Sequence, residues 1–423
     1  MQNDDHVPLA PFRLLERIAA GAPGLPHLED EIQRPLAALQ LPSDKLRGRR
    51  IAVTAGSRGI ANLREIVRAI CTWLKAQGAQ PFVFPAMGSH GGGTAEGQRR
   101  ILEDYGVTAE QVGAEIRSSM ETVCIGTTPE GFKVFMDRNA WEADGVVVMN
   151  RIKPHTDFSG KIESGLLKMM AVGMGKLDGA TQTHRQGWKY GFERIIRSLS
   201  GATIASGKIL CGLSVIENEF HQICAVRANR PEEIVANEER DLARARTLVP
   251  RIPVPAFQVL MVDEVGKNIS GAAMDTKVVG RVVKLEPGEA PEIGLIYARD
   301  LTSESEGNAI GIGMADLMHE RLFRKIDLQK THVNARVSLW PPMARLPFFL
   351  PSDREALDVG LGYLGRPEPE EQSLVWIRNT LNLGRIAVSE ALVPQVAVLS
   401  GWRLAPESFA PQFDEQGDLL SPW

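Results

Sequence analysis

The sequence predicts an α/β protein with two α/β domains, largely parallel sheets and an active site in the interdomain cleft. Short apolar runs typical of buried strands alternate with segments of helical periodicity along the chain. A length of 423 residues exceeds what one ordinary core organises. Several strand candidates end in small and polar residues, and ligands bind beyond the carboxyl ends of the strands in open parallel sheets.

The first predicted α/β unit is a strand over Arg50 to Ala55, a turn at Gly56 to Gly59 and an amphipathic helix. The helix places Ile66, Ile70 and Leu74 on one face, with Asn62 as its cap and Gly78 as its stop. Apolar runs predict further strands over Pro81 to Pro85, Gly145 to Met149 and Lys208 to Ile216.

Three prolines between Pro250 and Pro255 resist both helix and central strand, and predict an interdomain linker. The predicted domains are 1–250, which binds the cofactor and carries catalysis, and 257–423, a second α/β domain. In the latter we expect strands over Phe257 to Val262 and Ile293 to Ala298, a helix over Gly307 to Leu322, and another helix opened by a capping box at Ser352 to Glu355. Trp340 to Pro351 is interpreted as a packed surface loop, with a lid or subunit contact as alternatives.

Composition excludes several classes of function. A charged fraction of 24% and a net charge of −4 lack the basic excess that nucleic-acid binding needs. No apolar run approaches the roughly 20 residues that span a bilayer, so no membrane partner is expected. The acidic, polar start has no leader pattern, and we expect a cytoplasmic protein. The four cysteines show no CxxC pairing, which argues against a disulfide framework and a cysteine zinc site.

Candidate functional residues follow four predicted strands, and we expect them to converge on one site. Arg58 lies in a glycine-flanked turn, where its guanidinium could clamp a carboxylate or phosphate; a surface ion pair is the alternative. Ser89, His90, Gly91 and Gly92 begin a loop whose backbone amides could approach an anion. That loop lacks the Gly-Lys-Ser/Thr of a Walker motif, and a plain flexible turn explains it equally well.

The third strand end leads to His155, which follows Pro154 and has Asp157 and Glu163 nearby to orient its imidazole. The fourth leads through Asp263 to Lys267. A lone histidine is more often structural than catalytic, but His155 shares its strand-end position with His90.

Two further residues complete the candidate set. Lys168 lies in an apolar sequence, Ser-Gly-Leu-Leu-Lys-Met-Met, where it either extends to solvent or is paired or modified. His184, between Thr183 and Arg185 in a predicted polar turn, could ligate a metal through a neutral imidazole.

The order of these motifs, from about Arg50 to about Leu399, resembles the nickel-dependent lactate racemase family. The resemblance implies racemisation or epimerisation of a 2-hydroxy acid. It also implies a nickel pincer cofactor, pyridinium-3,5-bisthiocarboxylic acid mononucleotide, attached to a lysine as a thioamide. Maturation proteins would insert its sulfur and nickel. A homodimer is a candidate assembly.

Residue by residue, Lys168 resembles the attachment lysine, and His184, sixteen residues later, the nickel ligand. His90 in Gly-Ser-His and His155 in Lys-Pro-His-Thr-Asp-Phe-Ser-Gly are similar to the two catalytic histidines. Arg58 resembles the arginine near cofactor and substrate, and Lys267 the lysine that faces the substrate.

The resemblance implies that hydride passes between substrate and cofactor while the two histidines exchange the hydroxyl proton. Gly91 stands where lactate racemase has an arginine, Ala55 where an aspartate is expected, and Glu264 where lactate racemases carry glutamine. The segment from His155 to Lys168 is also longer, so the expected substrate is a 2-hydroxy acid other than or larger than lactate. Two alternatives remain open: a non-catalytic protein that binds the cofactor or a phosphorylated ligand, and a metal-independent sugar-phosphate or nucleotide enzyme.

Overall fold

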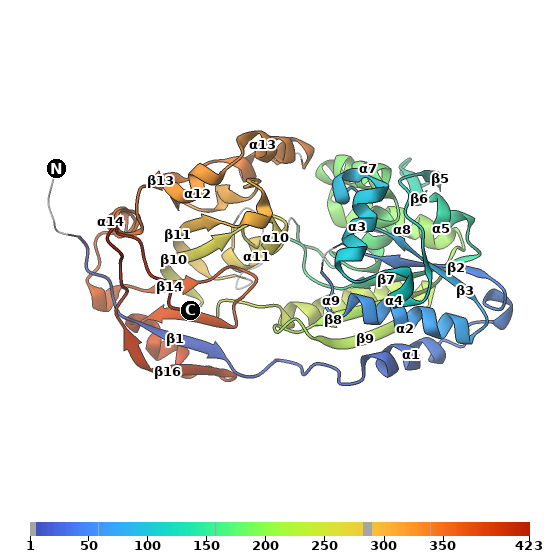
Figure 1. Cartoon of the computed structure of the whole chain (residues 1–423), viewed down its shortest axis with the longest axis horizontal. Helices are drawn as coiled ribbons and strands as arrows, with labels where there is room; N and C mark the ends of the chain where they lie inside the picture. The colour runs from blue at the N-terminus through green and yellow to red at the C-terminus, as the bar shows by residue number, and fades with distance from the viewer. Residues whose placement is uncertain (1–5, 58, 157, 282–289, 339) are drawn as a thin grey trace. The chain divides into compact units, whose positions relative to one another are not determined.

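The computed structural model describes residues 6–57, 59–156, 158–281, 290–338 and 340–423, with the side chain of residue 337 excluded (Figure 1). The chain forms two compact units, Gly21–Val249 and Pro250–Trp423, and the second also includes the N-terminal residues up to Ala20. We call them the 21–249 unit and the 250–423 unit. The division at Pro250 falls at the predicted linker, but the prediction had placed the N-terminal residues in the first domain.

The 21–249 unit is built on a six-stranded sheet of order β4-β3-β2-β7-β8-β9. Its strands up to β8 pair in parallel, and β9 is antiparallel to β8. The strands are β2 (Arg50–Ala55), β3 (Gln80–Pro85), β4 (Glu115–Ile116), β7 (Gly145–Arg151), β8 (Ile209–Glu217) and β9 (Ile223–Asn229). A separate antiparallel hairpin consists of β5 (Thr122–Thr127) and β6 (Lys133–Asp137).

Both faces of this sheet are covered, as the apolar strands require. Along β2, Ile51 and Val53 belong to the core under α1 (Leu28–Ala38) and α2 (Leu63–Ala76). Ala52, which points to the other face, belongs to the core under α6 (Leu166–Lys168), α8 (Phe192–Ala205) and the start of α9 (Ile234–Leu248). The remaining helices are α3 (Ala95–Asp104), α4 (Ala109–Val112), α5 (Arg138–Glu142), a π-helix (Met169–Gly173) and α7 (Lys176–Tyr190).

The 250–423 unit holds an eight-stranded mixed sheet of order β13-β12-β11-β10-β14-β15-β1-β16. The five strands from β13 to β14 are parallel, and β15, β1 and β16 continue antiparallel. The strands are β1 (Phe12–Arg17), β10 (Ala256–Val265), β11 (Glu292–Leu301), β12 (Leu317–His319), β13 (Phe348–Leu350), β14 (Leu374–Ile377), β15 (Arg385–Ser389) and β16 (Trp402–Phe409). The helices are α10 (Lys267–Ser270), α11 (Thr276–Val279), α12 (Glu320–Lys325), α13 (Leu328–Val337), α14 (Asp353–Tyr363) and α15 (Val393–Val396). The predicted α/β class with largely parallel sheets is confirmed.

The N-terminal strand explains how the units divide. β1 pairs with β15 on one side and β16 on the other, so it is an interior strand of the second sheet. Phe12 and Leu15 are fully buried there. Because β1 pairs with a strand more than 360 residues away, no local pattern in the sequence indicates its partner. The first domain was therefore predicted to include β1.

One predicted element is wrong and another is refined. The segment from Gly307 to Leu322 is not one helix, because Gly307 and Gly311 adopt φ values of +81° and +96°, outside the helical region. Its middle forms a short 3-10 turn over Ile312–Met314, β12 follows, and the α-helix α12 begins only at Glu320. The predicted loop from Trp340 to Pro351 contains a short helical turn and β13, an edge strand.

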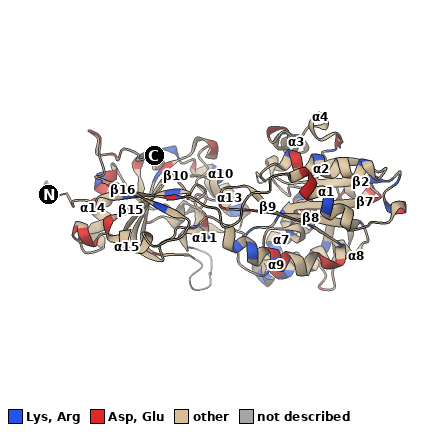
Figure 2. Cartoon of the chain, turned by 90° about the horizontal axis from the view of Figure 1, so that it is seen from below, with Lys and Arg blue, Asp and Glu red and all other residues tan. Residues whose placement is uncertain are grey.

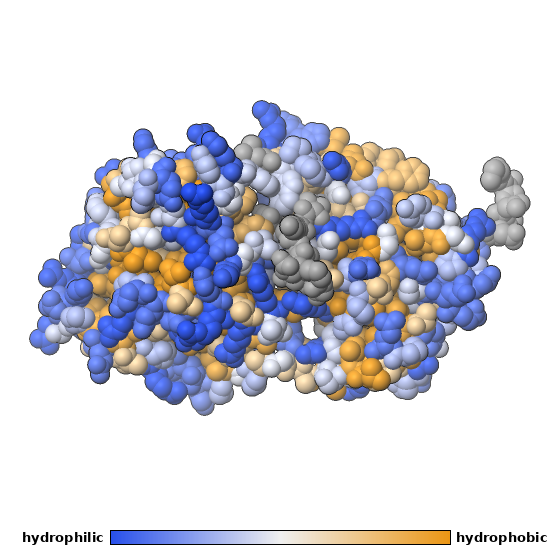
Figure 3. Space-filling model, turned by 180° about the vertical axis from the view of Figure 1, so that it is seen from behind, coloured by the Kyte–Doolittle hydropathy of each residue, from blue (hydrophilic) through white to orange (hydrophobic). Residues whose placement is uncertain are grey.

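Both signs of charge are distributed over the two units (Figure 2), and polar and apolar side chains are interspersed on the face that Figure 3 shows. Within the described part of the chain, none of the helices combines the length and apolar character needed to cross a membrane.

Candidate active site

Three of the four predicted strand ends share one sheet edge. β3, β2 and β7 are neighbours and parallel, so Ser57, His90 and His155 all follow the carboxyl ends of adjacent strands. Lys267 follows β10, which belongs to the sheet of the other unit. Arg58 and Asp157 lie outside the described residues.

His90 is held at both its backbone and its ring. Its N–H donates to the carbonyl of Met87 at 3.1 Å, which closes the turn after β3. The Ser57 hydroxyl forms a hydrogen bond with Nδ1 of the imidazole. Tyr105 in turn donates its hydroxyl to the Ser57 carbonyl at 3.0 Å. A histidine whose one ring nitrogen is held in this way has a defined ring orientation, which proton transfer requires.

The glycines after His90 form a tight turn that leads into α3. Gly91, Gly92 and Gly93 all have φ near +65°, a region that favours glycine. A β-carbon on Gly91 would lie 2.6 Å from the backbone of Gln98, whereas one on Gly92 would meet nothing within 4 Å. Thr94 then caps α3 by accepting from the Gly97 N–H at 3.0 Å. The turn therefore packs closely on the first turn of α3, while Ser89 and Gly92 are exposed.

A buried carboxylate braces the His155 loop. Glu163 is fully buried, and its oxygens accept from the backbone N–H groups of His155 and of Gly160, the latter at 3.1 Å. Arg246 from α9 pairs with the same carboxylate at 2.5 Å. Lys153 and Ser164 form a β-bridge that closes the loop. The sequence suggested that Glu163 could orient the imidazole, and the structure shows that it binds the backbone N–H of His155.

The segment that carries Lys168 lies across the three strand ends. Asn150, at the end of β7, donates to the Gly165 carbonyl at 2.7 Å. A β-carbon on Gly56, which follows β2, would lie 3.2 Å from the Met169 side chain. Gly88, which follows β3, donates its N–H to Gly173 at 3.2 Å. Lys168 is half-buried and immediately precedes the π-helix, a local distortion that is frequent at functional sites.

Glu238 of α9 forms a hydrogen bond with the backbone of the segment that carries Lys168. Its carboxylate accepts from the Leu167 N–H at 3.0 Å. Residue 165 must be a glycine for this contact, because a β-carbon on Gly165 would collide with the Glu238 carboxylate. Burial raises the pKa of Glu238 to about 7, although its hydrogen bonds to Leu167 and Leu166 oppose that shift. Its second oxygen has no hydrogen-bond partner among the residues that the structure describes.

An aromatic stack connects His155 with His184. The His155 ring stacks on Phe158 at a centroid distance of 4.5 Å, and Phe158 stacks on Phe192 at 5.2 Å. The edge of Phe192 meets His184 at 6.0 Å. His184 lies within the helix α7 and not in the predicted turn; it is half-buried, one turn after Ala180, which packs beside Gly88. The stack and this packing gather His90, His155, Lys168 and His184 around one edge of the sheet.

Lys267 opens α10 in the 250–423 unit and is exposed. Its Nζ donates to Asn334 at 2.7 Å, and its backbone N–H donates to the Ser305 hydroxyl at 2.9 Å. Glu264, three residues earlier, lies 3.3 Å from both Arg378 and Asn379.

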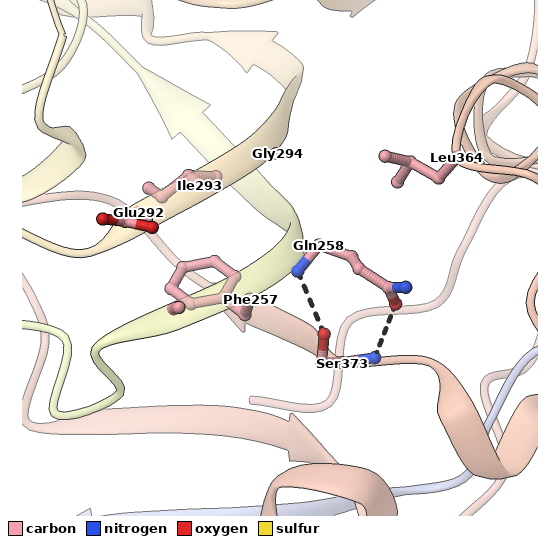
Figure 4. Close-up of a pocket in the computed structure, with 8 residues that line it drawn as sticks. Phe257, Gln258, Glu292, Ile293, Gly294, Leu364 and Ser373 are labelled. Carbon is pink, nitrogen blue, oxygen red and sulfur yellow. Dashed lines mark hydrogen bonds between the residues drawn. The ribbon is translucent and has the colours of Figure 1, made fainter.

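The 250–423 unit also contains a pocket of about 460 Å³ lined by Phe257, Glu292 and neighbouring residues (Figure 4). Beside it, the Gln258 N–H donates to the Ser373 hydroxyl at 3.1 Å, and the Ser373 N–H donates to the Gln258 side-chain oxygen at 2.9 Å. The pocket lies at the amino ends of β10, β11 and β14. Lys267 follows the opposite end of β10, so this pocket does not include it.

His319, Asp353 and Asp418 lie close enough together to hold a metal ion. Their charges are already compensated, because Arg299 pairs with Asp353 at 2.6 Å and Arg321 with Asp418 at 2.8 Å. Nδ1 of His319 accepts the Arg321 N–H at 2.9 Å, so its Nε2 carries the proton that it donates to Asp418. The cluster is therefore an ion-pair network.

Sequence reasoning missed the residues that support the site. Ser57 is adjacent to Arg58, and Phe158 is three residues after His155, yet neither residue type by itself marks a functional position. Glu238 and Phe192 contact the site from helices far along the chain. Residue type was the only available signal, and it could not show which distant side chains meet.

Comparisons with known proteins bear on the family of one part of the chain and on its fold. Residues 27–188 match the family described as lactate racemase N-terminal domain. Among curated proteins, no sequence matches the chain significantly. The fold is similar to the structure of the lactate racemase apoprotein from Thermoanaerobacterium thermosaccharolyticum, with a TM-score of 0.51, 16% identity, and coverage of 88% of this chain and 99% of that one. The resemblance is confirmed for residues 27–188, which carry a lactate racemase N-terminal domain, and the chain shares its fold with the lactate racemase apoprotein.

Proposed function

We propose that the protein is a racemase or epimerase of a 2-hydroxy acid other than or larger than lactate. One observation carries the proposal: the Lys168 segment lies across the ends of β2, β3 and β7, the sheet edge where His90 and His155 follow their strands and to which an aromatic stack links His184. Two imidazoles that can exchange protons, a lysine and a possible metal ligand thus meet at the sheet edge where α/β proteins bind ligands.

The residues present fit a nickel pincer nucleotide. Lys168 is half-buried and ends α6, the short helical turn that follows Gly165. Glu238 accepts the Leu167 N–H of this turn, which fixes the backbone position of Lys168. His184 offers an imidazole nitrogen, a ligand type that nickel accepts. Lys168 would hold the cofactor covalently, and His184 would complete the coordination of nickel. Ser89, Gly91 and Gly92 would provide backbone contacts.

The cofactor, when bound, supplies a hydride acceptor that spares the substrate carbon from becoming a carbanion. The chain supplies the proton chemistry. His90 and His155 take the hydroxyl proton from one enantiomer and return a proton to the other, because imidazole can both accept and donate a proton. Ser57 orients the His90 ring, and Phe158 orients the His155 ring.

Arg58 is the candidate in the 21–249 unit for binding the substrate carboxylate and Lys267 the candidate in the 250–423 unit, because each carries a positive charge and hydrogen-bond donors suited to that group. The Lys267 amine already donates to a neutral amide oxygen of Asn334, which a carboxylate would outcompete electrostatically. Ala55, Gly91 and Glu264 are the positions that favour a substrate other than lactate.

The proposal is tested by incubating one enantiomer of each member of a 2-hydroxy acid panel with protein matured by the sulfur-inserting and nickel-loading partners. We expect the opposite enantiomer, or the epimer, to form from at least one acid larger than lactate. The double variant His90→Ala/His155→Ala should abolish the exchange, whereas His27→Ala, at the exposed start of α1, should not. Normal exchange by the double variant would disprove the two-histidine scheme. Retained cofactor with no turnover of any acid would favour the non-catalytic alternative.

A further inference from the structure

A polar cluster lies fully buried beneath the His90 loop. It consists of Gln98 from α3, Lys176 at the start of α7 and Asp137 at the end of β6, and all three residues are 0% exposed. We call it the Gln98–Lys176–Asp137 hub. The Lys176 ammonium has three oxygen neighbours: the Pro85 carbonyl, the Gln98 side-chain oxygen at 3.0 Å and an Asp137 oxygen at 3.1 Å.

The side-chain amide of Gln98 connects the hub to the catalytic loop. Because an ammonium group only donates hydrogen bonds, the Gln98 oxygen must face Lys176, and its NH₂ group must face the loop. That NH₂ group donates to the carbonyls of Gly88 at 2.9 Å and His90 at 3.3 Å. The backbone of His90 is therefore fixed by a side chain whose own orientation is set by Lys176.

Lys176 is also the first residue of α7, the helix that carries His184 eight residues later. It adopts φ of +53°, an uncommon conformation for a lysine, which is held by its buried contacts. Asp137 caps α5 by accepting from the Ala140 N–H at 3.2 Å, and its own N–H donates to Met174 at 2.7 Å. The hub thus joins the loop of His90 to the helix of His184.

A contribution to the stability of the folded protein does not by itself explain why these three polar residues are buried together. Burial lowers the pKa of Lys176 and raises the pKa of Asp137, and their mutual attraction opposes both shifts. Apolar residues of similar volume often replace a buried ion pair without loss of stability, whereas a buried pair can fix one arrangement of its neighbours. The observation that needs explanation is the convergence of the hub on the two elements that carry His90 and His184.

We propose that Gln98 and Lys176 are positioning residues that fix the His90 imidazole relative to the helix of His184. The inference rests on the proposed function for the roles of the two histidines, but the geometry that it concerns belongs to the protein without cofactor. Neither residue touches substrate in this scheme. Their effect passes through the carbonyls of Gly88 and His90 and through the start of α7.

The test is NMR of the histidine rings in the apoprotein, with His90 assigned from its loss in His90→Gln. Gln98→Glu retains an oxygen for Lys176 but removes both N–H donors to the loop. Gln98→Leu removes both kinds of contact. The matched control is Gln372→Leu in the 250–423 unit, because Gln372 is equally buried and also donates to two backbone carbonyls, Pro8 at 2.8 Å and Pro367 at 3.1 Å.

Both Gln98 variants should shift or broaden the His90 ring signals, while Gln372→Leu leaves them at their wild-type positions. In matured protein, the Gln98 variants should lower kcat about 10- to 100-fold with a smaller change in KM, as expected when a catalytic group is misplaced by about 1 Å. If Gln98→Leu does not fold, Gln98→Glu and the charge-free pair Lys176→Met/Asp137→Asn provide the same readout. Unchanged His90 signals in the folded variants would overturn the proposal. If the His90 signals shift but the matured protein racemises no acid, the positioning role of Gln98 and Lys176 stands and the proposed function is rejected.

Discussion

Glu163 shows how one buried residue shapes the candidate site. Its carboxylate accepts from two backbone N–H groups of the His155 loop and pairs with Arg246. Each oxygen accepts from the loop, so an amide in place of the carboxylate would turn an NH₂ group toward a donor. The loop geometry therefore depends on the charged form of this residue.

Glu163→Gln is expected to lower the free energy of unfolding of the 21–249 unit by about 3 kcal/mol, the usual cost of breaking a buried ion pair. Urea unfolding monitored by circular dichroism measures this change. Glu103→Gln is the control, since Glu103 is exposed on α3 and should change stability by less than about 0.5 kcal/mol. Equal effects of the two substitutions would contradict the bracing role of Glu163.

Glu238 should make the stability of the same unit depend on pH. Burial raises its pKa from 4.5 to about 7 in the folded protein, so the folded state keeps a proton that the unfolded chain releases between these values. Stability that this proton contributes is present below pH 4.5 and is lost as the pH rises to 7, by up to about 3 kcal/mol.

Glu238→Gln has no proton to release, and its stability should rise relative to wild type across this pH range. Parallel urea titrations from pH 4.5 to pH 8 measure the difference. A wild-type-to-variant difference that stays constant with pH would show that Glu238 does not titrate there.

At this scale, residue type at a strand end indicated His90 and His155, whereas Lys168 and His184 received their roles only from the family resemblance. Residue type could not identify Ser57, Glu238 or Gln98. Their importance comes from contacts between segments that are far apart in the chain, and a single sequence does not record such contacts.

The turn after β3 is the element whose geometry most constrains the site. Gly91 and Gly92 share the same φ, so a side chain at either position strains the backbone by about 1–2 kcal/mol. Only at Gly91 does a β-carbon also collide with α3.

Gly91→Ala should therefore lower the free energy of unfolding by clearly more than Gly92→Ala, whose cost is limited to the backbone strain of about 1–2 kcal/mol. Thermal or urea unfolding of the two variants compares them directly. Equal losses would mean that the turn is not packed on α3 as described.

Strands β2, β3, β7 and β8 could be predicted nearly to the residue, because strands covered on both faces are continuously apolar. The helix expected over 307–322 failed for a physical reason: two glycines with positive φ interrupt an apolar pattern that a short parallel strand also satisfies. The π-helix after Lys168 has no sequence signal of its own.

At the scale of the whole molecule, β1 makes the 250–423 unit depend on residues from the other end of the chain. A fragment of residues 21–249 should unfold cooperatively, whereas residues 250–423 alone lack the strand between β15 and β16. That fragment should give a weak, non-cooperative urea transition, and adding a peptide of residues 6–20 should restore cooperativity. A cooperative transition by residues 250–423 without the peptide would contradict this account.

The division near Pro250 was predictable from three prolines, since they mark a segment that forms neither helix nor central strand. The return of the N-terminus to the second sheet was not predictable, because a six-residue strand such as β1 specifies its partner only through long-range packing.

The central claim is that Lys168 carries a cofactor with which the protein inverts a 2-hydroxy acid centre without exchanging its C2 hydrogen. The most direct measurement follows the matured protein, with its adduct mapped by peptide mass spectrometry, as it converts one enantiomer in D₂O. We predict an adduct on Lys168, appearance of the opposite enantiomer or epimer, and no deuterium at C2. An adduct on a different residue, deuterium at C2 of the product, or loaded protein that leaves every 2-hydroxy acid unchanged would contradict the account.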